Sequence, residues 1–455
     1  MKQVVIIGGG ISGCLTALEL SRNKLLNISL FEKRNELLSG PPFCHLHAGG
    51  MLYPTLSLIE CETLLNHSLL FAKYFKDCLI DRPTIIAYRK DTYNPLKLII
   101  KCKMMQYIYS CWTKLNKEEP LGPSNTYYAI YTREDLENFK KDELYNTNNN
   151  YHDLYVKKFC KLLNNIDDIQ YPFVSVREPG ISMEKISFNL KSKLKAINNI
   201  KIYTSTRVDI VEKLENKWQI EFNNTRIESD CLINAAGCNI NELYTLNVDT
   251  LPSQSSSLVK VHVSGQGHVD GQSSDDKNKE CHYLELKSSW LIKNTKVDFE
   301  YMPEIAIIGE RGTSNGMIQI TPTENKNIFQ LHCMTYDSTL FKDGCVTISN
   351  DDKTPIYLHF PKYIQDILKN DCIQDYQIDI RTQNAIRNIS DFFPIFKTSL
   401  VYGDPLWGIQ RIVGESKDTR TNDYIIIDNY VEIQIIKAIS SVWSVKNLVK
   451  NLNVL

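Results

Sequence analysis

The sequence lacks long apolar runs and an excess of charge of either sign. No segment reaches the roughly 18 uninterrupted apolar residues of a membrane-spanning helix. Among 455 residues, 52 Lys and Arg face 53 Asp and Glu, which gives a formal net charge of -1. A chain with this balance has no overall field that would attract nucleic acid or an anionic surface. We therefore expect a small-molecule substrate and no nucleic-acid partner.

Paired cysteines are also missing, although the sequence contains 13 cysteines. They are scattered, without a CxxC pair or a His/Cys cluster at zinc spacing, so we expect no metal site. Such cysteines are typical of buried thiols in a reducing cytosol. A strand-like run, Gln3–Ile7, starts almost at Met1 and leaves no space for a signal peptide. The sequence thus predicts a cytoplasmic protein.

The composition of one segment is compatible with a peripheral contact to a membrane. Leu96–Trp112 combines Lys97, Lys101 and Lys103 with large apolar side chains, as helices at a membrane interface do. A cap packed over an active site explains the same composition. Both interpretations of residues 96–112 stay open, and the first would place the protein on the inner membrane.

The hydrophobic pattern changes its period several times along the chain. Residues 3–34 predict a strand, a glycine turn, a helix and a second strand. Residues 258–348 mostly alternate apolar and polar positions and carry hairpin signals, which predicts an antiparallel sheet. The other expected elements are helices at residues 57–78, 132–141, 184–196 and 361–369, strands at residues 200–204, 207–214, 218–222 and 231–237, and a strand and helix after residue 391.

A glycine motif, Gly8-Gly9-Gly10-Ile11-Ser12-Gly13, stands between the first strand and the first helix. Gly8 permits a tight turn, Gly10 lets the backbone approach a pyrophosphate, and Gly13 lets the helix and strand pack closely. The N–H groups at the helix start, around Ile11 and Ser12, meet the phosphate charge with help from the helix dipole. The motif predicts a dinucleotide site.

An acid stands where this interpretation requires one. Glu32 ends the second strand, roughly twenty residues after the glycines. Its carboxylate is suited to accept hydrogen bonds from ribose hydroxyls and to repel a 2′-phosphate, which argues against NADP. The local motif does not choose between FAD and NAD.

Three parts of the sequence together resemble one flavoprotein family. They are VVIIGGGISGCLTALELSR with LFEKR, then HLHAGGMLYP, and then EPGISMEKISFNLKSKL with IKIYTSTRVDIVEKLENKWQIEF and CLINAAGCNINEL. In them the sequence is similar to the FAD-dependent oxidoreductases that include D-amino-acid oxidase, glycine and sarcosine oxidases, and glycerol-3-phosphate dehydrogenase. The resemblance implies FAD as the cofactor.

The resemblance also implies where FAD is held. In the family, the strand that matches Val208 contacts adenine, and a small-residue turn that matches Ala235-Ala236-Gly237 lets another strand approach the cofactor. An NAD enzyme has no reason to carry these two elements, so FAD is favoured over NAD. Besides the glycine motif and Glu32, the residues expected at the cofactor are Lys33, Arg34, His45, His47, Ala48, Gly49, Gly50, Met51, Val208, Ala235, Ala236 and Gly237.

The implied fold is α/β, a Rossmann-like FAD-binding domain with a second α+β substrate domain built on an antiparallel sheet. We expect the FAD-binding domain at residues 1–80, 176–250 and 386–455, a cap or substrate-domain insertion at 81–175, and the substrate sheet at 251–385. One departure stands out. The family's glycine-rich turn before the last helix has no counterpart, and Asp423–Tyr430 leads instead into a helix expected from Glu432.

Chemistry at the flavin ring needs groups that orient a substrate, accept a proton and stabilise charge. Gln330, His332 and Met334 alternate along one expected strand, so His332 faces either the flavin or the outer side of the sheet. An Arg suits an anionic substrate because its guanidinium binds carboxylates bidentately. The catalytic candidates are His47, His332 and Arg411, and Arg311, Arg381 and Arg387 are further anion-binding candidates. Ordinary packing and surface salt bridges are the alternatives for each.

The leading hypothesis is an FAD-dependent dehydrogenase or oxidase. It would take hydride from a small amine or a 2-hydroxy acid onto flavin N5 and pass the electrons to oxygen or quinone. One alternative is a flavin monooxygenase that uses NAD(P)H, although the sequence holds no second GxGxxG motif. Another is a flavoprotein-like binding or assembly protein without catalysis, which the irregular C-terminal segment keeps open.

Overall fold

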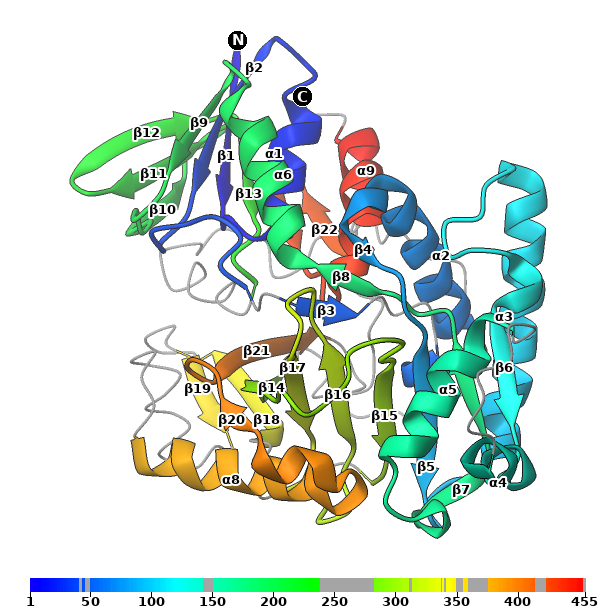
Figure 1. Ribbon diagram of the computed structural model, residues 1–455. Coiled ribbons are helices and arrows are strands. Elements are labelled where there is room, and N and C mark those ends of the chain that lie inside the picture. The colour runs from blue at the N-terminus through cyan, green and yellow to red at the C-terminus, as the bar shows by residue number, and fades with distance from the viewer. Residues whose placement is uncertain are drawn as a thin grey trace, which may run out of the picture.

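The computed structural model describes residues 1–40, 43–45, 50–141, 150–237, 282–310, 313–336, 338, 341–348, 355–358, 375–413 and 423–452. These residues form two parts, each built on its own large sheet (Figure 1). Both chain ends lie in the first part. The chain crosses between the parts several times, so each is assembled from separated pieces of sequence.

The first part contains a six-stranded sheet in the order β22-β23-β13-β1-β2-β9. Apart from the antiparallel pair β22–β23, its described strands run parallel. Apolar residues dominate β1 and β2 because layers of structure cover both faces of a parallel sheet. The strands are β1 (Lys2–Ile7), β2 (Leu26–Phe31), β9 (Ile200–Tyr203), β13 (Cys231–Asn234), β22 (Tyr424–Ile427) and β23 (Tyr430–Ile433).

Helices α1 (Ile11–Leu20), α6 (Met183–Lys195) and α9 (Ser441–Asn451) pack on one face of this sheet. The other face carries a three-stranded antiparallel sheet of β10 (Ile210–Lys213), β11 (Trp218–Phe222) and β12 (Thr225–Ser229). Trp218, Ile220 and Phe222 alternate along β11 and pack against Val5 and Phe31 of the parallel sheet. The two layers explain why β1 is buried on both faces.

The second part is an 11-stranded sheet with the main path β19-β18-β14-β17-β16-β15-β5-β7-β6, and β20 and β21 also pair with β14. Among its described strands, only β15 and β5 pair in parallel. Its strands are β5 (Thr84–Arg89), β6 (Tyr128–Tyr131), β7 (Ile169–Val176), β14 (His282–Lys293), β15 (Glu304–Ile308), β16 (Ile318–Pro322), β17 (Ile328–Cys333), β18 (Phe341–Ile348), β19 (Pro355–Leu358), β20 (Leu400–Val401) and β21 (Leu406–Val413).

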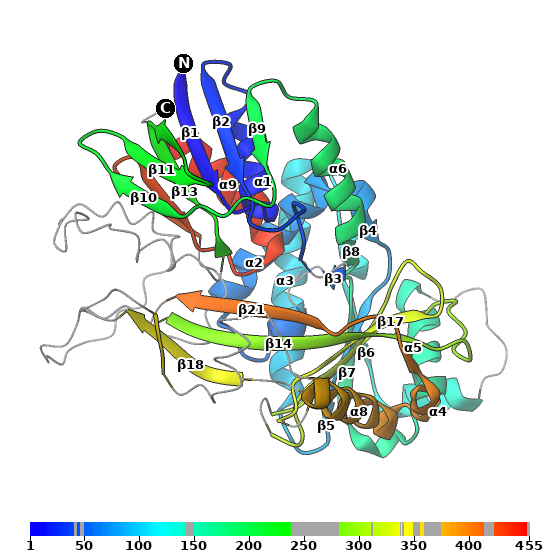
Figure 2. The same ribbon diagram turned by 90° about the vertical axis from the view of Figure 1, so that its left-hand side faces the viewer.

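One face of the second sheet is covered by helix α8 (Asp375–Phe392). Ala385 and Ile389 of α8 pack with Ile320, Phe329 and Leu331 in one buried cluster. Figures 1 and 2 both place the sheet between α8 and the first part. The face opposite α8 is therefore the one turned toward the first part.

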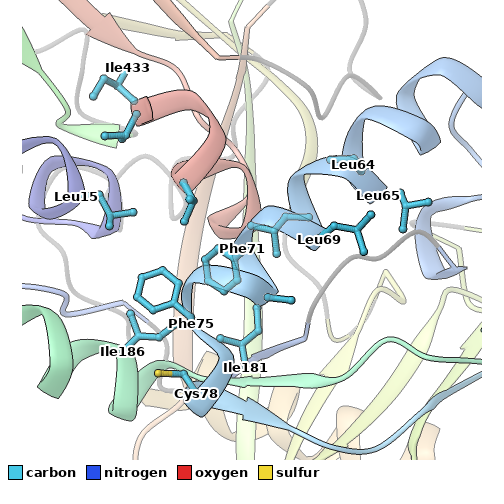
Figure 3. Close-up of a cluster of buried hydrophobic side chains, with 14 of the residues drawn as sticks. Leu15, Leu64, Leu65, Leu69, Phe71, Phe75, Cys78, Ile181, Ile186 and Ile433 are labelled. Carbon is cyan, nitrogen blue, oxygen red and sulfur yellow. The ribbon is translucent and has the colours of Figure 1, made fainter. Parts of the chain in front are cut away.

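Four helices connect and flank the two parts: α2 (Leu58–Tyr74), α3 (Pro95–Asn116), α4 (Arg133–Lys141) and α5 (Tyr151–Leu162). Figure 3 shows Leu64, Leu69 and Phe71 of α2 in one buried cluster with Leu15 of α1 and Ile433 of β23. The 3-10 helices are η1 (Gly50–Leu52), η2 (Lys76–Cys78), η3 (Ser124–Thr126), η4 (Ile166–Asp168), η6 (Pro394–Thr398) and η7 (Ala438–Ser440). None of the described helices is long and apolar enough to cross a membrane.

A small sheet lies between the two parts (Figure 1). It pairs β8 (Gly180–Ser182) with β3 (Phe43–His45) on one side and β4 (Leu79–Ile80) on the other. β4 leads directly toward β5, and β8 leads into α6. Backbone hydrogen bonds thus join three chain segments, β3, β8 and β4, that lie between the two parts.

The predicted fold class is confirmed, with a Rossmann-like parallel sheet and a second, mainly antiparallel sheet. The helix predicted from Glu432 is wrong. Glu432 lies in β23, because this strand sits between β13 and β22 with all four of its residues buried, and α9 begins only at Ser441. The strand expected from residue 207 begins at Ile210, and the helix expected at residues 361–369 lies outside the described residues.

The large sheet contains strands from several of the segments that were expected to belong to different domains. Strands from residues 81–175 and 251–385 share it, and β20 and β21 join it from the stretch expected in the FAD-binding domain. The expected domain boundaries stay a prediction.

Candidate active site

The glycine turn joins β1 to α1 through very close backbone contacts. Gly8 has φ +110, and a Cβ there would lie 2.3 Å from the carbonyl oxygen of Ala235. A Cβ on Gly13 would lie 1.9 Å from the carbonyl oxygen of Gly8. These two positions exclude any side chain, because both neighbours are backbone atoms that cannot move aside.

Gly10 is in a different environment. It is the N-cap of α1, makes no side-chain cap hydrogen bond, and has no atom within 4 Å of the place where a Cβ would lie. The N–H groups of the first helical turn, including Ile11 and Ser12, have no intrahelical acceptor and carry the positive end of the helix dipole. This open space beside the helix N-terminus suits an anionic group that approaches the backbone closely.

Glu32 is held at the edge of the same space. Its Oε2 accepts a 2.7 Å hydrogen bond from the N–H of Gly9, and its Oε1 accepts one of 2.9 Å from the N–H of Arg34. The guanidinium of Arg34 in turn donates to Oγ of Ser39 at 3.1 Å. The carboxylate therefore has a fixed position beside the glycine turn.

The adjacent strand ends complete this edge of the sheet. Ile7, Phe31 and Asn234 end β1, β2 and β13 and are aligned in register. After β13, the N–H of Ala235 donates to Ile7 at 2.8 Å, and Gly237 has φ +62 with no atom within 4 Å of its Cβ position. The turn of Ala235, Ala236 and Gly237 thus lies beside the glycine motif, at the carboxyl ends of the parallel strands.

Val208 lies near the end of β2. It is 7% exposed and belongs to the buried cluster that contains Phe31 and Val5. Two residues earlier, the N–H of Thr206 donates to the carbonyl oxygen of Glu32 at 2.9 Å. The segment from Thr206 to Val208 is therefore held against the end of β2, where Glu32 follows Phe31.

The segment predicted to face the flavin ring is described in part. His45 lies in β3 opposite Gly180, and Gly50 and Met51 lie in η1, whereas His47, Ala48 and Gly49 lie outside the described residues. A Cβ on Gly50 would lie 2.4 Å from Cδ1 of Ile86. The close packing of Gly50 fixes η1 against β5 of the second part.

A buried acid, Glu178, lies behind η1. Its side chain has no exposed surface, and the backbone N–H of Met51 donates to its carboxylate. Burial, followed by repulsion from Glu304, raises the pKa of Glu178 well above its usual range, while the hydrogen bond from Met51 and the charges of Arg82 and Lys437 act in the opposite direction. Lys437 lies between β23 and η7, so a charge from the C-terminal segment acts on Glu178.

A contact with α2 fixes η7, the 3-10 helix that leads into α9. Nδ1 of His67 on α2 lies 2.9 Å from Oγ of Ser440 in η7. The stretch that lacks the family's glycine-rich turn therefore packs against α2, and it carries Lys437 three residues before Ser440.

A row of polar side chains crosses the face of the large sheet turned toward the first part. Phe329 and Leu331 of β17 pack under α8, so Gln330 and His332 point to the opposite face. Register partners continue the row, since residues directly opposite one another share a face. Its members are Glu304 on β15, Gln319 and Thr321 on β16, Gln330 and His332 on β17, and Ser289 on β14.

Hydrogen bonds hold the side chains of this row in fixed positions. Nδ1 of His332 lies 2.9 Å from the carbonyl oxygen of Ser288, and Nε2 of Gln330 donates to Oγ of Ser289 at 3.0 Å. Nε2 of Gln319 donates to Glu304, which is also paired with the buried Arg82. Sequence reasoning found His332 but missed Gln319 and Thr321. The alternation of Gln319 and Thr321 with Ile318 and Ile320 is the sequence pattern that could have identified them.

The arginines predicted as anion ligands fall in different places. Arg411 lies in β21 with its backbone opposite Leu284 of β14, and its side chain lies outside the described residues. Arg381 and Arg387 belong to α8, on the side of the sheet that faces away from the first part (Figure 2). Arg311 lies outside the described residues. Among the residues that the structure describes, no group of three or more His, Cys, Asp or Glu side chains could hold a metal ion.

The glycine turn and Glu32 lie at the carboxyl ends of the parallel strands, where folds of this type bind dinucleotides. Residues 3–288 match the family model of the FAD dependent oxidoreductases, and the chain belongs to this family. It is an FAD-dependent oxidoreductase. No curated protein matches the sequence significantly.

Solved structures of several oxidoreductases have a similar fold. Glycine oxidase from Geobacillus kaustophilus matches with TM-score 0.56 at 11% identity, over 99% of this chain and 94% of that chain. L-Proline dehydrogenase from P.horikoshii matches with TM-score 0.56 at 12% identity, over 99% and 92%. FAD-bound L-alpha-glycerophosphate oxidase from Mycoplasma pneumoniae matches with TM-score 0.56 at 13% identity, over 100% and 95%.

The residues present fit the ADP half of FAD. The space over Gly10 lies at a helix N-terminus, where a pyrophosphate is favoured, and the fixed carboxylate of Glu32 stands beside it. Open space at Gly237 lies next to the same turn. Apart from its chain neighbours and the helix backbone, no atom of the described residues lies within 4 Å of a Cβ placed on Gly10.

Proposed function

We propose that this enzyme oxidises a small amine or a 2-hydroxy acid and passes the electrons to oxygen or quinone. Bound FAD supplies the hydride acceptor in such a reaction. The observation that carries the proposal is the polar row around His332, on the sheet face turned toward the first part. The solved structures with this fold include proteins named glycine oxidase, L-proline dehydrogenase and L-alpha-glycerophosphate oxidase, which supports this substrate class.

In this proposal His332 holds the substrate proton. Because a carbonyl oxygen only accepts hydrogen bonds, the contact with Ser288 assigns the hydrogen to Nδ1 and leaves Nε2 as the basic nitrogen. Gln319 and Gln330 flank His332, and their amide groups, held by Glu304 and Ser289, form the polar surroundings of the imidazole. The sheet fixes all three side chains on one surface, and this pre-organisation is what positioning requires.

Lys437 supplies positive charge at the ring end in place of the family's glycine-rich turn. Its attraction reaches Glu178, whose carboxylate accepts the N–H of Met51. A cation there stabilises negative charge that develops on the reduced ring. His47 and Arg411 remain proposed partners of the substrate, and a cytoplasmic location remains part of the proposal.

The test is anaerobic reduction of the purified yellow protein by a panel of amino acids and 2-hydroxy acids, followed by absorbance. We expect one class to bleach the flavin, and we expect His332→Ala to bleach more slowly at saturating substrate, with His332→Gln between the two. Bleaching by NAD(P)H alone would instead identify a monooxygenase. If no member of the panel bleaches the flavin, the proposed substrate class is wrong.

A further inference from the structure

Helix α3 presents an apolar stripe to the outside of the molecule. Leu96, Ile100, Met104 and Tyr107 are 58%, 58%, 41% and 71% exposed. Residues three or four apart share one face of a helix, so these four side chains form a continuous stripe. Figure 1 shows α3 along an outer side of the molecule. At the C-terminal end of α3, Leu115 adds a side chain that is 83% exposed.

The opposite face of α3 already anchors the helix to the body of the protein. Leu98, Cys102, Met105 and Tyr109 are buried there. Nζ of Lys101 also donates to the carbonyl oxygens of Tyr53 and Leu56, at 2.5 Å and 2.6 Å. The inner face already makes the contacts between α3 and the core. The exposed stripe is therefore a separate apolar surface.

Positive charge borders the stripe on both sides. At 100° per residue, Lys103 projects on one side of Ile100 and Lys97 on the other, and both lysines are exposed. The helix contains no Asp or Glu from Pro95 to Asn116. Lysines beside a row of large apolar side chains are typical of a helix that lies in the interface of an anionic membrane.

We infer that α3 is a docking surface for an anionic lipid bilayer. The stripe from Leu96 to Tyr107 enters the boundary between headgroups and acyl chains, and Lys97 and Lys103 contact lipid phosphates. The charge pattern favours lipid over a second copy of this chain, because two such faces would bring lysines against lysines. The inference is independent of the proposed substrate, and its test needs no enzyme activity.

The test is flotation of the FAD-loaded protein with vesicles of phosphatidylcholine, alone or mixed with phosphatidylglycerol. We expect the protein to float with the mixed vesicles and to remain unbound with phosphatidylcholine alone. Lys97→Gln with Lys103→Gln should lower the partition coefficient about 30-fold, given about 1 kcal/mol for each lysine near an anionic surface. Ile100→Glu with Tyr107→Glu should lower it by at least about tenfold, since two apolar side chains no longer enter the interface.

Phe188→Glu is the matched control, because Phe188 is 75% exposed on α6, away from α3. This variant should float like the unaltered protein. Flotation that survives both double variants would overturn the inference, as would the absence of flotation with mixed vesicles. A dimer that Ile100→Glu dissociates, in a protein that binds no vesicles, would assign the stripe to self-association instead. Thermal unfolding checks that each variant is folded.

Discussion

The carboxylate of Glu32 and the backbone N–H of Gly9 are joined by a hydrogen bond of 2.7 Å. The bond links the end of β2 to the glycine turn after β1, so the acid and the turn form one rigid unit. A carboxylate held this way needs no reorganisation when ribose hydroxyls arrive, and such pre-organisation increases affinity.

Glu32→Ala should weaken FAD binding by about 1–3 kcal/mol, because hydrogen bonds to a charged group are lost. Titration of the apoprotein with FAD, followed by flavin fluorescence, measures the change. Glu36→Ala is the control, since Glu36 pairs with Lys191 at 2.8 Å and its side chain is 66% exposed. Equal affinities for the two variants would contradict a ribose contact by Glu32.

Gly10→Ala should leave stability unchanged and Gly13→Ala should lower it, while both should weaken cofactor binding. A methyl group on Gly10 meets no atom within 4 Å, so the protein should unfold at an unchanged temperature while FAD affinity falls. A methyl group on Gly13 would collide with Gly8, and such overpacking costs about 1–3 kcal/mol. Thermal unfolding and FAD titration of both variants separate the two effects. Unchanged FAD affinity in Gly10→Ala would place the pyrophosphate elsewhere.

His152 should make the protein sensitive to acid. Its Nδ1 lies 2.8 Å from Oγ of Ser175 and its Nε2 lies 2.9 Å from the carbonyl oxygen of Thr126. Burial lowers the pKa of His152 from 6.5 to about 4. The unfolded chain therefore binds a proton more readily, and stability that is fully present above pH 6.5 is lost as the pH falls toward 4.

The loss should reach about 2 kcal/mol at pH 5 and approach about 3 kcal/mol below pH 4, at 1.36 kcal/mol for each pKa unit. Urea unfolding at pH 7.5 and at pH 5 measures it in the unaltered protein and in His152→Gln. The glutamine variant should be less stable at the higher pH but less sensitive to acid. If both proteins lose the same free energy of unfolding, His152 does not carry the pH dependence.

Arg82 and Glu304 form a buried ion pair, with side chains 3% and 0% exposed. Arg82→Met should destabilise the protein by about 3–5 kcal/mol, because the charge of Glu304 remains buried without its cation. Adding Glu304→Gln should restore a substantial part of this stability. Denaturant unfolding of the two single variants and the double variant gives the coupling free energy. Simple additivity of the single effects would contradict a coupled pair.

If Lys437 lies at the ring end of the site, as proposed, Lys437→Gln should lower the reduction potential of the bound flavin, because positive charge near the ring favours its reduced form. A tenfold change in the redox equilibrium corresponds to about 30 mV for a two-electron couple, and we expect a shift of at least that order. Equilibration with a reference dye measures the potential. Lys446→Gln, on the exposed side of α9, is the charge-matched control and should leave the potential unchanged.

The sequence predicted the glycine turn and the acid beside it because the determinants of both are local. Gly8, Gly13 and Glu32 lie within one βαβ unit, and their roles follow from backbone geometry within that unit. The polar row on the second sheet is not local. His332 meets Gln319 through a hairpin, and Glu304 meets Arg82 through a parallel pairing between distant segments. Only the assembled sheet shows which alternating residues share a face.

The C-terminal segment shows why a short apolar run is ambiguous. Tyr430–Ile433 fits either a buried strand or the start of a helix by composition. The hairpin with β22 and the pairing with β13 decide for a strand, and neither partner is visible in the run itself.

The position of β23 in the first sheet has a consequence for synthesis on the ribosome. Val431 pairs with Ile233, and the carbonyl oxygen of Asn429 accepts the N–H of Leu232, so β13 has an open edge until nearly the whole chain has been made. The nascent protein must hold an unpaired strand edge for about 200 residues of translation, a state prone to aggregation. A chain terminated before residue 430 should therefore be a substrate for chaperones and proteases, even though it contains every residue of the glycine motif.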